Sequence, residues 1–314
     1  MNPLVIASQF GAEFDGWLRT ARPDLTLVSL PPVLEWPLPP QVSVLLAVPV
    51  SAEVRARPRP EGWPFGLRWV QLNSTGYNNY PPWMLRGTLV TSAHGTSSET
   101  IADWVLACVL QRALRMPERR ARSREQWRRT PAPALAGSTL GLFGFGGIGR
   151  ALARRALALG MQVRAMRRQS AALDMDGVQQ AADIEDLMAT SDHLALVAPG
   201  TEATRHVVNA RTLGLARPGL HLINVARGSL VDQQALIESL DAGQLSWASL
   251  DVTEPEPLPE GHPLYAHPKV FLTPHTCAIS PQVRKAVFEK FMRSLRAWEA
   301  GGMPEDPVDL ERGY

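Results

Sequence analysis

The 314-residue sequence has few cysteines and no uninterrupted hydrophobic run of membrane length. Its two cysteines, Cys108 and Cys277, form no CxxC pair and allow at most one bridge, which excludes a disulfide-dense scaffold and favours a reducing compartment. The uncharged run from Trp36 to Ala52 is broken by prolines and cannot form a spanning helix of about 20 apolar residues. The N-terminus has no basic region typical of a signal peptide, so we predict a cytoplasmic protein.

A strong charge of one sign is also absent. Lysine and arginine total 32 and aspartate and glutamate total 30, a net charge of +2 that gives no reason to expect a nucleic-acid or membrane partner. Lysine itself is scarce, so nearly all the basic residues are arginines, whose planar fork suits phosphate and carboxylate. We also expect no metal site.

The length predicts about two domains, and the pattern predicts an α/β fold. In the first third, buried strands are expected at residues 4–8, 25–30, 42–48 and 69–72, with a helix at 11–21. A capping box from Thr96 to Glu99 predicts a helix that runs to about Arg115, followed by a solvated charged segment at 118–129.

From Thr139 onward, strands and helices alternate regularly, as in a doubly wound domain. Six parallel strands are expected, at residues 139–143, 162–166, 193–197, 221–225, 249–252 and 270–272. Helices are expected at 148–159, 184–190, 209–215 and 233–242. A last helix at 282–301 carries one apolar face and is expected to fold back on the N-terminal part.

The turn after the first of these six strands has the pattern GxGxxG. Gly144 permits a tight turn, Gly146 lets the backbone approach a pyrophosphate, and Gly149 lets the helix pack close to the strand. The free N–H groups at the helix N-terminus, around Gly147 and Ile148, are expected to bind an anion such as the pyrophosphate. A strand before and a helix after the turn favour dinucleotide binding over a glycine turn that binds nothing.

The residues that end the next strand predict which dinucleotide is bound. An NAD site needs a carboxylate there for the ribose 2′-hydroxyl, but this chain has Arg167, Arg168 and Ser170. Guanidinium and hydroxyl groups would bind a 2′-phosphate, so NADP(H) is the preferred cofactor and NAD(H) a possible one. The alternative is that these arginines are simply exposed.

Four segments resemble the D-2-hydroxyacid dehydrogenase family: residues 140–149, 224–232, 250–259 and 272–275. The resemblance implies a Rossmann dinucleotide-binding domain (99–281) inserted into a flavodoxin-like substrate domain (1–98 and 282–314). It also implies a homodimer. Trp127 is a candidate for the aromatic residue that reaches the partner's active site in some members, although an interface or surface tryptophan is the simpler interpretation.

In this family an arginine, a glutamate and a histidine carry the reaction, and they map onto Arg227, Glu256 and His275. An arginine can bind a substrate carboxylate and polarise a carbonyl. A histidine can donate or accept the proton, and a glutamate can fix its tautomer. Taken singly, each residue also has an ordinary interpretation as a loop residue, and Glu254 is a rival to Glu256.

Further contacts follow from the resemblance alone. Thr75 and Gly76 match the loop whose N–H groups receive the substrate carboxylate, together with Arg227 and His275. Asp251 matches a residue that contacts the carboxamide of the cofactor. The remaining predicted cofactor contacts are Pro199, Thr204 and Ala226.

The motifs are most similar to those of NADPH-preferring glyoxylate/hydroxypyruvate reductases, so the expected substrate is a small 2-keto or 2-hydroxy acid. A phosphoglycerate dehydrogenase-like enzyme is the alternative within enzymes. A non-catalytic NAD(P)H-sensing protein, similar to corepressors of this fold, is the alternative from another class. The sequence leaves these open.

Overall fold

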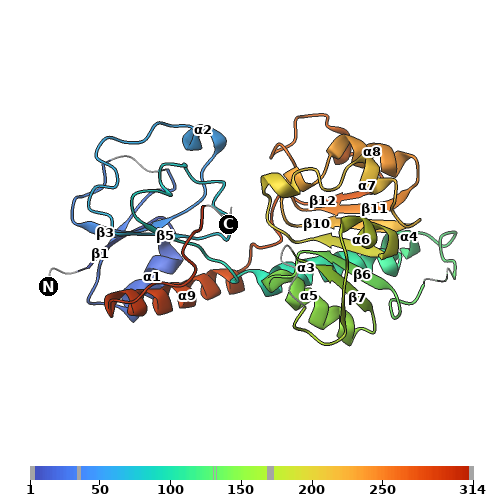
Figure 1. Ribbon diagram of the computed structural model, residues 1–314, viewed down its shortest axis with the longest axis horizontal. Helices are drawn as coiled ribbons and strands as arrows, with labels where there is room; N and C mark the ends of the chain where they lie inside the picture. The colour runs from blue at the N-terminus through green and yellow to red at the C-terminus, as the bar shows by residue number, and fades with distance from the viewer. Residues whose placement is uncertain (1–3, 34–36, 130, 132, 168–172, 311–314) are drawn as a thin grey trace. The chain divides into compact units, whose positions relative to one another are not determined.

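The computed structural model describes residues 4–33, 37–129, 131, 133–167 and 173–310. The chain divides into two compact units: residues 1–96 together with 280–314, and residues 97–279 (Figure 1). Each unit is built on one sheet in which every strand pairing is parallel. The predicted α/β class is therefore confirmed, whereas the roles of the two units as substrate and dinucleotide domains remain predictions.

The described residues of the first unit form five strands: β1 (Val5–Ser8), β2 (Thr26–Ser29), β3 (Val42–Ala47), β4 (Trp69–Leu72) and β5 (Leu89–Thr91). They lie in the order β2-β1-β3-β4-β5. Helices α1 (Ala12–Ala21) and α9 (Pro281–Glu299) cover one face, and loop side chains that include Trp63, Tyr80 and Met84 pack on the other. The short helix α2 (Ala52–Arg55) follows β3.

Helix α9 joins the C-terminal part of the chain to the N-terminal part. Its apolar face carries Val287, Phe291 and Leu295, which pack in one cluster with Phe14 of α1. The ring of Phe291 stacks on buried Trp69 of β4 with centroids 5.3 Å apart. Each such side chain contributes roughly 1.5–3 kcal/mol by burial, so the predicted return of the last helix is confirmed with a clear energetic reason.

In the second unit, the part of the chain that the structure describes forms seven strands: β6 (Thr139–Phe143), β7 (Gln162–Met166), β8 (Val178–Gln180), β9 (His193–Leu196), β10 (Leu220–Asn224), β11 (Leu245–Leu250) and β12 (Val270–Leu272). They lie in the order β12-β11-β10-β9-β6-β7-β8. The chain extends the sheet from β6 through β7 in one direction and then from β9 in the other. The carboxyl ends of β6 and β9 thus flank the switch point where such sheets bind ligands.

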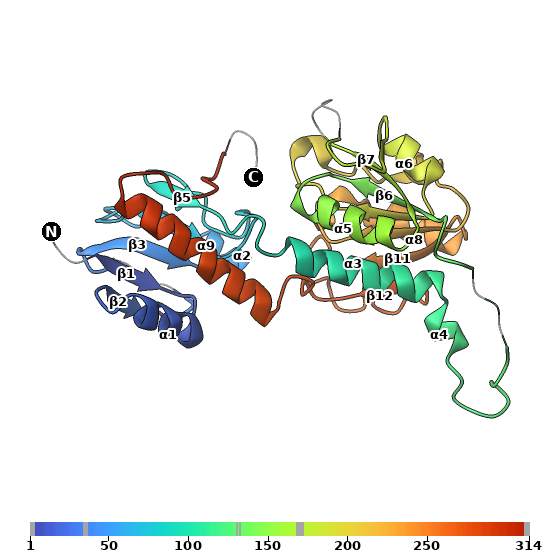
Figure 2. The ribbon, with the colours of Figure 1, turned by 90° about the horizontal axis from the view of Figure 1, so that it is seen from below.

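Helices cover both faces of this sheet. Helices α3 (Ser98–Ala113) and α5 (Gly147–Ala158) pack on one face, and α6 (Ile184–Thr190), α7 (Ala210–Leu213) and α8 (Gln233–Asp241) on the other. The one-turn helix α4 (Met116–Arg119) and the exposed segment 120–129 project from the unit (Figure 2). The 3₁₀ turns η1 (Glu202–Thr204), η2 (Gly228–Leu230) and η3 (Pro263–Tyr265) lie in loops of this unit.

Two expectations from the sequence are wrong in detail. The predicted capping box does not form, because Ser97 is the N-cap of α3 without a side-chain cap, and Glu99 instead forms ion pairs of 2.7 Å with Arg154 and Arg155 of α5. Thr96 donates its hydroxyl proton to the Ala93 carbonyl. The sheets also have one more strand each than expected, since β5 and β8 are three-residue edge strands too short for a periodic signal.

A pair of buried histidines links three strands of the second unit. The Nδ1 atoms of His193 and His221 lie 3.0 Å apart, and Nε2 of His221 lies 2.9 Å from the Ser249 hydroxyl. Burial lowers the pKa of His193 to about 4, and it holds the pKa of His221 well below its usual value. The charge of Arg112 acts in the same direction on both rings, whereas Asp192 opposes it at His193. Both imidazoles are therefore neutral in the folded protein at neutral pH.

This pair makes the stability of the chain sensitive to acid. The unfolded chain takes up protons at these imidazoles near pH 6.5, whereas the folded chain does so only at lower pH. The contribution of these two histidines to the free energy of unfolding is therefore fully present above that range. It falls as the pH drops, by up to about 1.4 kcal/mol per pH unit for each imidazole. We expect the urea midpoint to fall less between pH 7.5 and pH 5 in the double variant His193→Leu/His221→Leu than in the wild type. Equal falls would contradict this account.

Candidate active site

Three neighbouring strands deliver the three predicted catalytic residues to one edge of the second sheet. Arg227 follows β10, Glu256 follows β11 and His275 follows β12. These strands are adjacent and parallel, so their carboxyl ends lie at the same edge. This sheet order explains how residues almost 50 positions apart come together.

Glu256 and His275 are in direct contact. The Glu256 Oε2 atom lies 2.8 Å from Nδ1 of His275, and Oε1 accepts the Thr253 N–H at 3.1 Å. Burial alone would raise the pKa of Glu256, but the hydrogen bond and charge of His275, the Thr253 N–H and the Arg227 charge outweigh it and lower this pKa. The carboxylate is thus an anion aimed at one ring nitrogen. The other nitrogen, Nε2, forms no hydrogen bond with any described residue.

The rival carboxylate, Glu254, is engaged elsewhere. It forms an ion pair of 3.0 Å with Arg205, and its backbone groups bond to the side chain of Gln233. The two glutamates lie on either side of Pro255 in the chain and bond to different partners, Glu254 to Arg205 and Glu256 to His275. The structure therefore places Glu256, and not Glu254, beside the imidazole.

The backbone that carries His275 is held by Asp251, which is 1% exposed. His275 has a left-handed backbone with φ of 53°, a conformation that non-glycine residues rarely adopt. Its N–H donates to the Asp251 carbonyl at 2.8 Å. The Asp251 carboxylate accepts the N–H groups of Thr276 and Cys277 at 2.9 and 3.0 Å, and also the Thr273 hydroxyl. Asp251 therefore organises the histidine loop, and its predicted carboxamide contact remains a prediction.

Arg227 occupies a turn that two residues without a predicted role keep in place. The Asn224 side chain accepts the Ala226 N–H at 3.1 Å and donates to the Arg227 carbonyl at 2.8 Å. A Cβ at Gly200 would lie 2.8 Å from Cγ of Arg227, so this glycine leaves room for the arginine. Burial lowers the pKa of Arg227, and the nearby Glu256 and Cys277 oppose that effect. Asn224 belongs to the segment 224–232 that resembles the family. Nothing in the sequence pointed to Gly200 except that it follows Pro199.

The glycine-rich turn fits the backbone of a phosphate cradle. Gly144 has φ of 114°, and a Cβ there would lie 2.7 Å from the Ala198 nitrogen. At Gly149 a Cβ would lie 2.6 Å from the Gly144 carbonyl oxygen, which confirms the need for close helix-strand packing. Gly146, by contrast, is exposed and a Cβ would meet nothing within 4 Å. Gly146 is also the N-cap of α5 without a side-chain cap, so no capping side chain occupies the first-turn N–H groups.

The residues predicted to select the dinucleotide are only partly described. Arg168 and Ser170 lie outside the described residues. Arg167 follows β7, and its Nε atom is buried without a hydrogen-bond partner among the described residues. An orphaned guanidinium N–H at this position fits an anionic group of a bound cofactor. Nearby, Arg150 lies over the Phe145 ring and pairs with Asp174.

The other predicted contacts lie in two loops. Pro199 and Thr204 belong to the loop after β9, where the Thr204 hydroxyl donates to the Pro199 carbonyl at 2.9 Å. Thr75 and Gly76 belong to the first unit, in the loop after β4. Within the described part of the chain their N–H groups form no hydrogen bond, so both donors are free for an anion.

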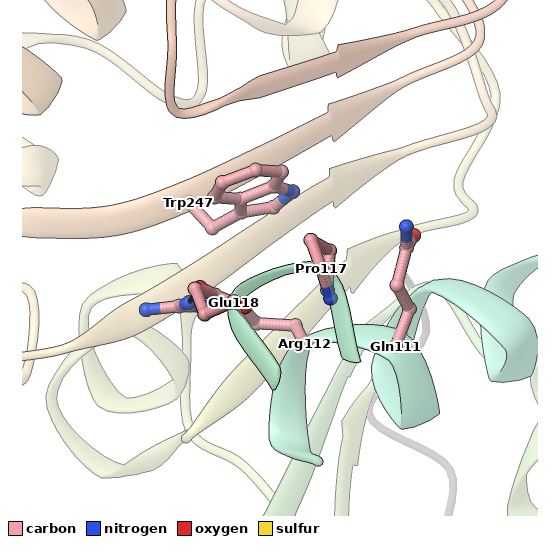
Figure 3. A pocket seen from close by; sticks show the side chains of 5 residues that line it. All are labelled: Gln111, Arg112, Pro117, Glu118 and Trp247. Atoms are coloured by element: carbon pink, nitrogen blue, oxygen red, sulfur yellow. Dashed lines mark hydrogen bonds and ion pairs between the residues drawn. The ribbon is translucent and has the colours of Figure 1, made fainter. Parts of the chain in front are cut away.

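A shallow surface pocket in the second unit offers no comparable chemistry. It is lined by Gln111, Arg112, Pro117, Glu118 and Trp247 (Figure 3). Its two charged residues, Arg112 and Glu118, form an ion pair of 2.8 Å, and Arg112 also lies over the Trp247 ring. Across the described ranges, no cluster of three potential ligands is placed to hold a metal ion, and no helix has the length and apolar character to cross a bilayer.

The glycine geometry predicts opposite effects for two alanine substitutions. Gly146→Ala meets open space, so it should leave the melting temperature unchanged, but its methyl group enters the region where a pyrophosphate would lie. Gly149→Ala forces the Gly144 backbone to move and should lower the melting temperature. We expect Gly146→Ala to weaken NADPH binding by about tenfold or more, the equivalent of about 1.4 kcal/mol, as measured by nicotinamide fluorescence. Unchanged binding in Gly146→Ala would contradict the cradle.

Comparison with known proteins agrees with this geometry. Residues 106–277 match the model of the D-isomer specific 2-hydroxyacid dehydrogenase NAD-binding domain. A glyoxylate reductase of Korarchaeum cryptofilum is 34% identical over 85% of this chain and 82% of its own length. A glyoxylate/hydroxypyruvate reductase A of Serratia proteamaculans is 33% identical over 69% of each chain. A D-3-phosphoglycerate dehydrogenase of Methanocaldococcus jannaschii is 31% identical over 72% of this chain but only 44% of its own length.

A solved structure extends the similarity to the whole chain. The D-isomer specific 2-hydroxyacid dehydrogenase of Xanthobacter autotrophicus Py2, in complex with NADPH and MES, superposes with a TM-score of 0.82 at 28% identity and full coverage of both chains. The family model alone covers more than half of this chain. The chain therefore belongs to the D-isomer specific 2-hydroxyacid dehydrogenase family of NAD(P)-dependent oxidoreductases.

Proposed function

We propose that this chain reduces small 2-keto acids of the glyoxylate and hydroxypyruvate type to the corresponding 2-hydroxy acids, of D configuration where the product is chiral, with NADPH as the preferred reductant. The observation that carries the proposal is the 2.8 Å contact between Glu256 and His275, at the sheet edge that also carries half-buried Arg227. An ionised carboxylate, an imidazole with a free nitrogen and a partly desolvated guanidinium are the groups that this reaction needs. The similarity to glyoxylate reductases supports the choice of substrate.

The dinucleotide would be held by the glycine-rich turn and by Arg167, and when bound it supplies a hydride to the carbonyl carbon. Arg227 binds the substrate carboxylate and polarises the carbonyl, which is most effective for a guanidinium removed from water. His275 donates a proton from Nε2 to the oxygen, which becomes the hydroxyl. Glu256 keeps Nδ1 protonated and stabilises the imidazolium before the transfer. In the first unit, the N–H groups of Thr75 and Gly76 form no hydrogen bond with the described residues, which suits them to a carboxylate.

Substitutions at the dyad test these roles. His275→Ala removes the proton donor and should reduce kcat by about 10²–10⁴. Glu256 has a lowered pKa and is therefore an anion throughout the working range. Glu256→Gln removes the anion that bonds to the Nδ1 side of the ring, so kcat should fall by about tenfold or more, the range of a lost charge-assisted hydrogen bond.

Glu254→Gln is the matched control, because its carboxylate pairs with Arg205 and its loss should leave kcat unchanged. Wild-type turnover in His275→Ala, or equal kcat in the two glutamine variants, would remove the dyad from the mechanism.

The preference for NADPH rests on Arg167. Its buried Nε has no partner among the described residues, and no carboxylate follows β7 directly to hold a ribose 2′-hydroxyl. Arg167→Asp should reduce the ratio of kcat/KM for NADPH to that for NADH by roughly 10- to 100-fold, the range of a lost charge-assisted hydrogen bond. Arg124→Asp, on the exposed segment after α4, changes the net charge equally and should keep the wild-type ratio. A wild-type enzyme that uses both cofactors equally would refute the preference.

The alternatives make different predictions for the same assays. A phosphoglycerate dehydrogenase would turn over phosphohydroxypyruvate in preference to glyoxylate, and a nucleotide sensor would bind NADPH without reducing any 2-keto acid. A homodimer in a reducing cytoplasm is also part of the proposal. It is supported by Trp127, which is 82% exposed next to α4, by Met116 on the same projection, and by two buried free cysteines.

A further inference from the structure

The side chain of Gln233 holds the backbone of the loop that carries Glu256. Its Nε2 atom donates to the Glu254 carbonyl at 2.6 Å, and its Oε1 atom accepts the Glu254 N–H at 3.2 Å. An amide can do both at once because it carries a donor and an acceptor side by side. One side chain therefore satisfies both backbone groups of Glu254, although the sequence motifs assign it no role.

The helix from which Gln233 projects is itself held in place. Gln233 is the first residue of α8 and follows the N-cap, Asp232. The Asp232 carboxylate accepts the N–H groups of Gln234 and Ala235 at 3.1 and 3.2 Å. The buried face of α8 packs in the core of the second unit. Because the start of the helix is fixed in this way, Gln233 can hold Glu254 in position.

The start of η2 lies directly against the same loop. A Cβ at Gly228 would lie 2.1 Å from the Thr253 carbonyl oxygen and 2.5 Å from the Glu254 nitrogen. Only a residue without a side chain permits so close an approach of two backbones. The stretch 228–233 therefore contacts this loop at both of its ends.

Hydrogen bonds lead from Thr253 to the carboxylate of Glu256. The Thr253 N–H donates to Oε1 of Glu256 at 3.1 Å, and the Thr253 hydroxyl donates to the Pro255 carbonyl at 2.9 Å. While Oε1 is held by this N–H, Oε2 contacts Nδ1 of His275 at 2.8 Å. The backbone at residues 253 and 254 therefore determines where the carboxylate lies relative to the imidazole ring.

We infer that Gln233 is a positioning residue for the reaction, which holds both backbone groups of Glu254 and thereby keeps the Glu256 carboxylate on Nδ1 of His275. The inference rests on the proposed function and adds a residue to it. A carboxylate on Nδ1 keeps the proton of the neutral imidazole on that nitrogen. Loss of the Gln233 contacts should therefore change turnover and the tautomer of His275, and leave the affinity for the substrate unchanged.

A double-mutant cycle tests the inference. Gln233→Met keeps the length of the side chain and removes both hydrogen bonds, so kcat should fall by about threefold to tenfold at unchanged KM. In the Glu256→Gln background no anion remains to be positioned, so the same change should lower kcat by less than about twofold. Gln233→Ala removes the same two bonds and serves if the methionine variant does not fold.

The neighbouring residue provides a matched control. Gln234 is exposed, and its Nε2 atom donates to Glu238 of the same helix at 2.8 Å. Gln234→Met makes the same chemical change one position along the chain and should keep the wild-type kcat. Equal kcat in the two methionine variants, or full additivity of Gln233→Met and Glu256→Gln, would overturn the inference.

Nitrogen NMR of histidine-labelled protein gives a second readout that does not depend on turnover. At alkaline pH, where the imidazole is neutral, the His275 signals are identified by their absence from His275→Ala. Nδ1 should carry the proton in the wild type and in Gln234→Met, whereas the signals of Gln233→Met should move toward those of Glu256→Gln.

The two readouts separate the inference from the proposed function. A wild-type tautomer in Gln233→Met would overturn the inference whatever the activity of the variant. Failure of the wild type to reduce any 2-keto acid would overturn the proposed function, and the tautomer of Gln233→Met would still decide whether Gln233 positions the carboxylate.

Discussion

The buried carboxylate of Asp251 fixes the position of the imidazole on which the candidate chemistry depends. It accepts two backbone N–H groups and one hydroxyl from the loop after β12, and the carbonyl of the same residue accepts a third N–H, that of His275. A left-handed backbone at a histidine costs roughly 1–3 kcal/mol and persists only where its surroundings determine it. The four hydrogen bonds to Asp251 hold the loop, and with it His275, in this conformation. Because the loop is held in this way, the imidazole ring of His275 is in place to contact Glu256.

The parallel sheet of the second unit provides the frame for this arrangement. Five adjacent strands, β12, β11, β10, β9 and β6, end at one edge, and the loops that follow them carry His275, Glu256, Arg227, Thr204 and the glycine-rich turn. The groups proposed for proton transfer and for carboxylate binding therefore follow β10, β11 and β12. The proposed phosphate cradle follows β6, on the other side of β9. Each proposed role has its own part of the edge, because the order of the strands in the sheet decides which loops are neighbours.

Much of this arrangement could be predicted from the sequence because the buried strands are continuous apolar runs. The expected strand at 139–143 and the expected helix at 184–190 agree with β6 and α6 at both ends. The edge strand β8 was missed because its residues are mostly exposed and carry no such run. The role of Asp251 in holding the loop could not be predicted, since it depends on the distance between segments that follow different strands.

The order of the chain has a consequence for how the protein is made. The second unit is one continuous stretch, whereas the first unit is assembled from both ends of the chain. During synthesis the N-terminal strands emerge long before α9, and until then the sheet face that Phe291 and Leu295 will cover remains exposed to solvent. The inserted unit can finish folding while its host is still incomplete. The core of the first unit is thus completed only when the last helix leaves the ribosome. A nascent chain that is arrested before residue 280 keeps an exposed apolar surface to which chaperones can bind.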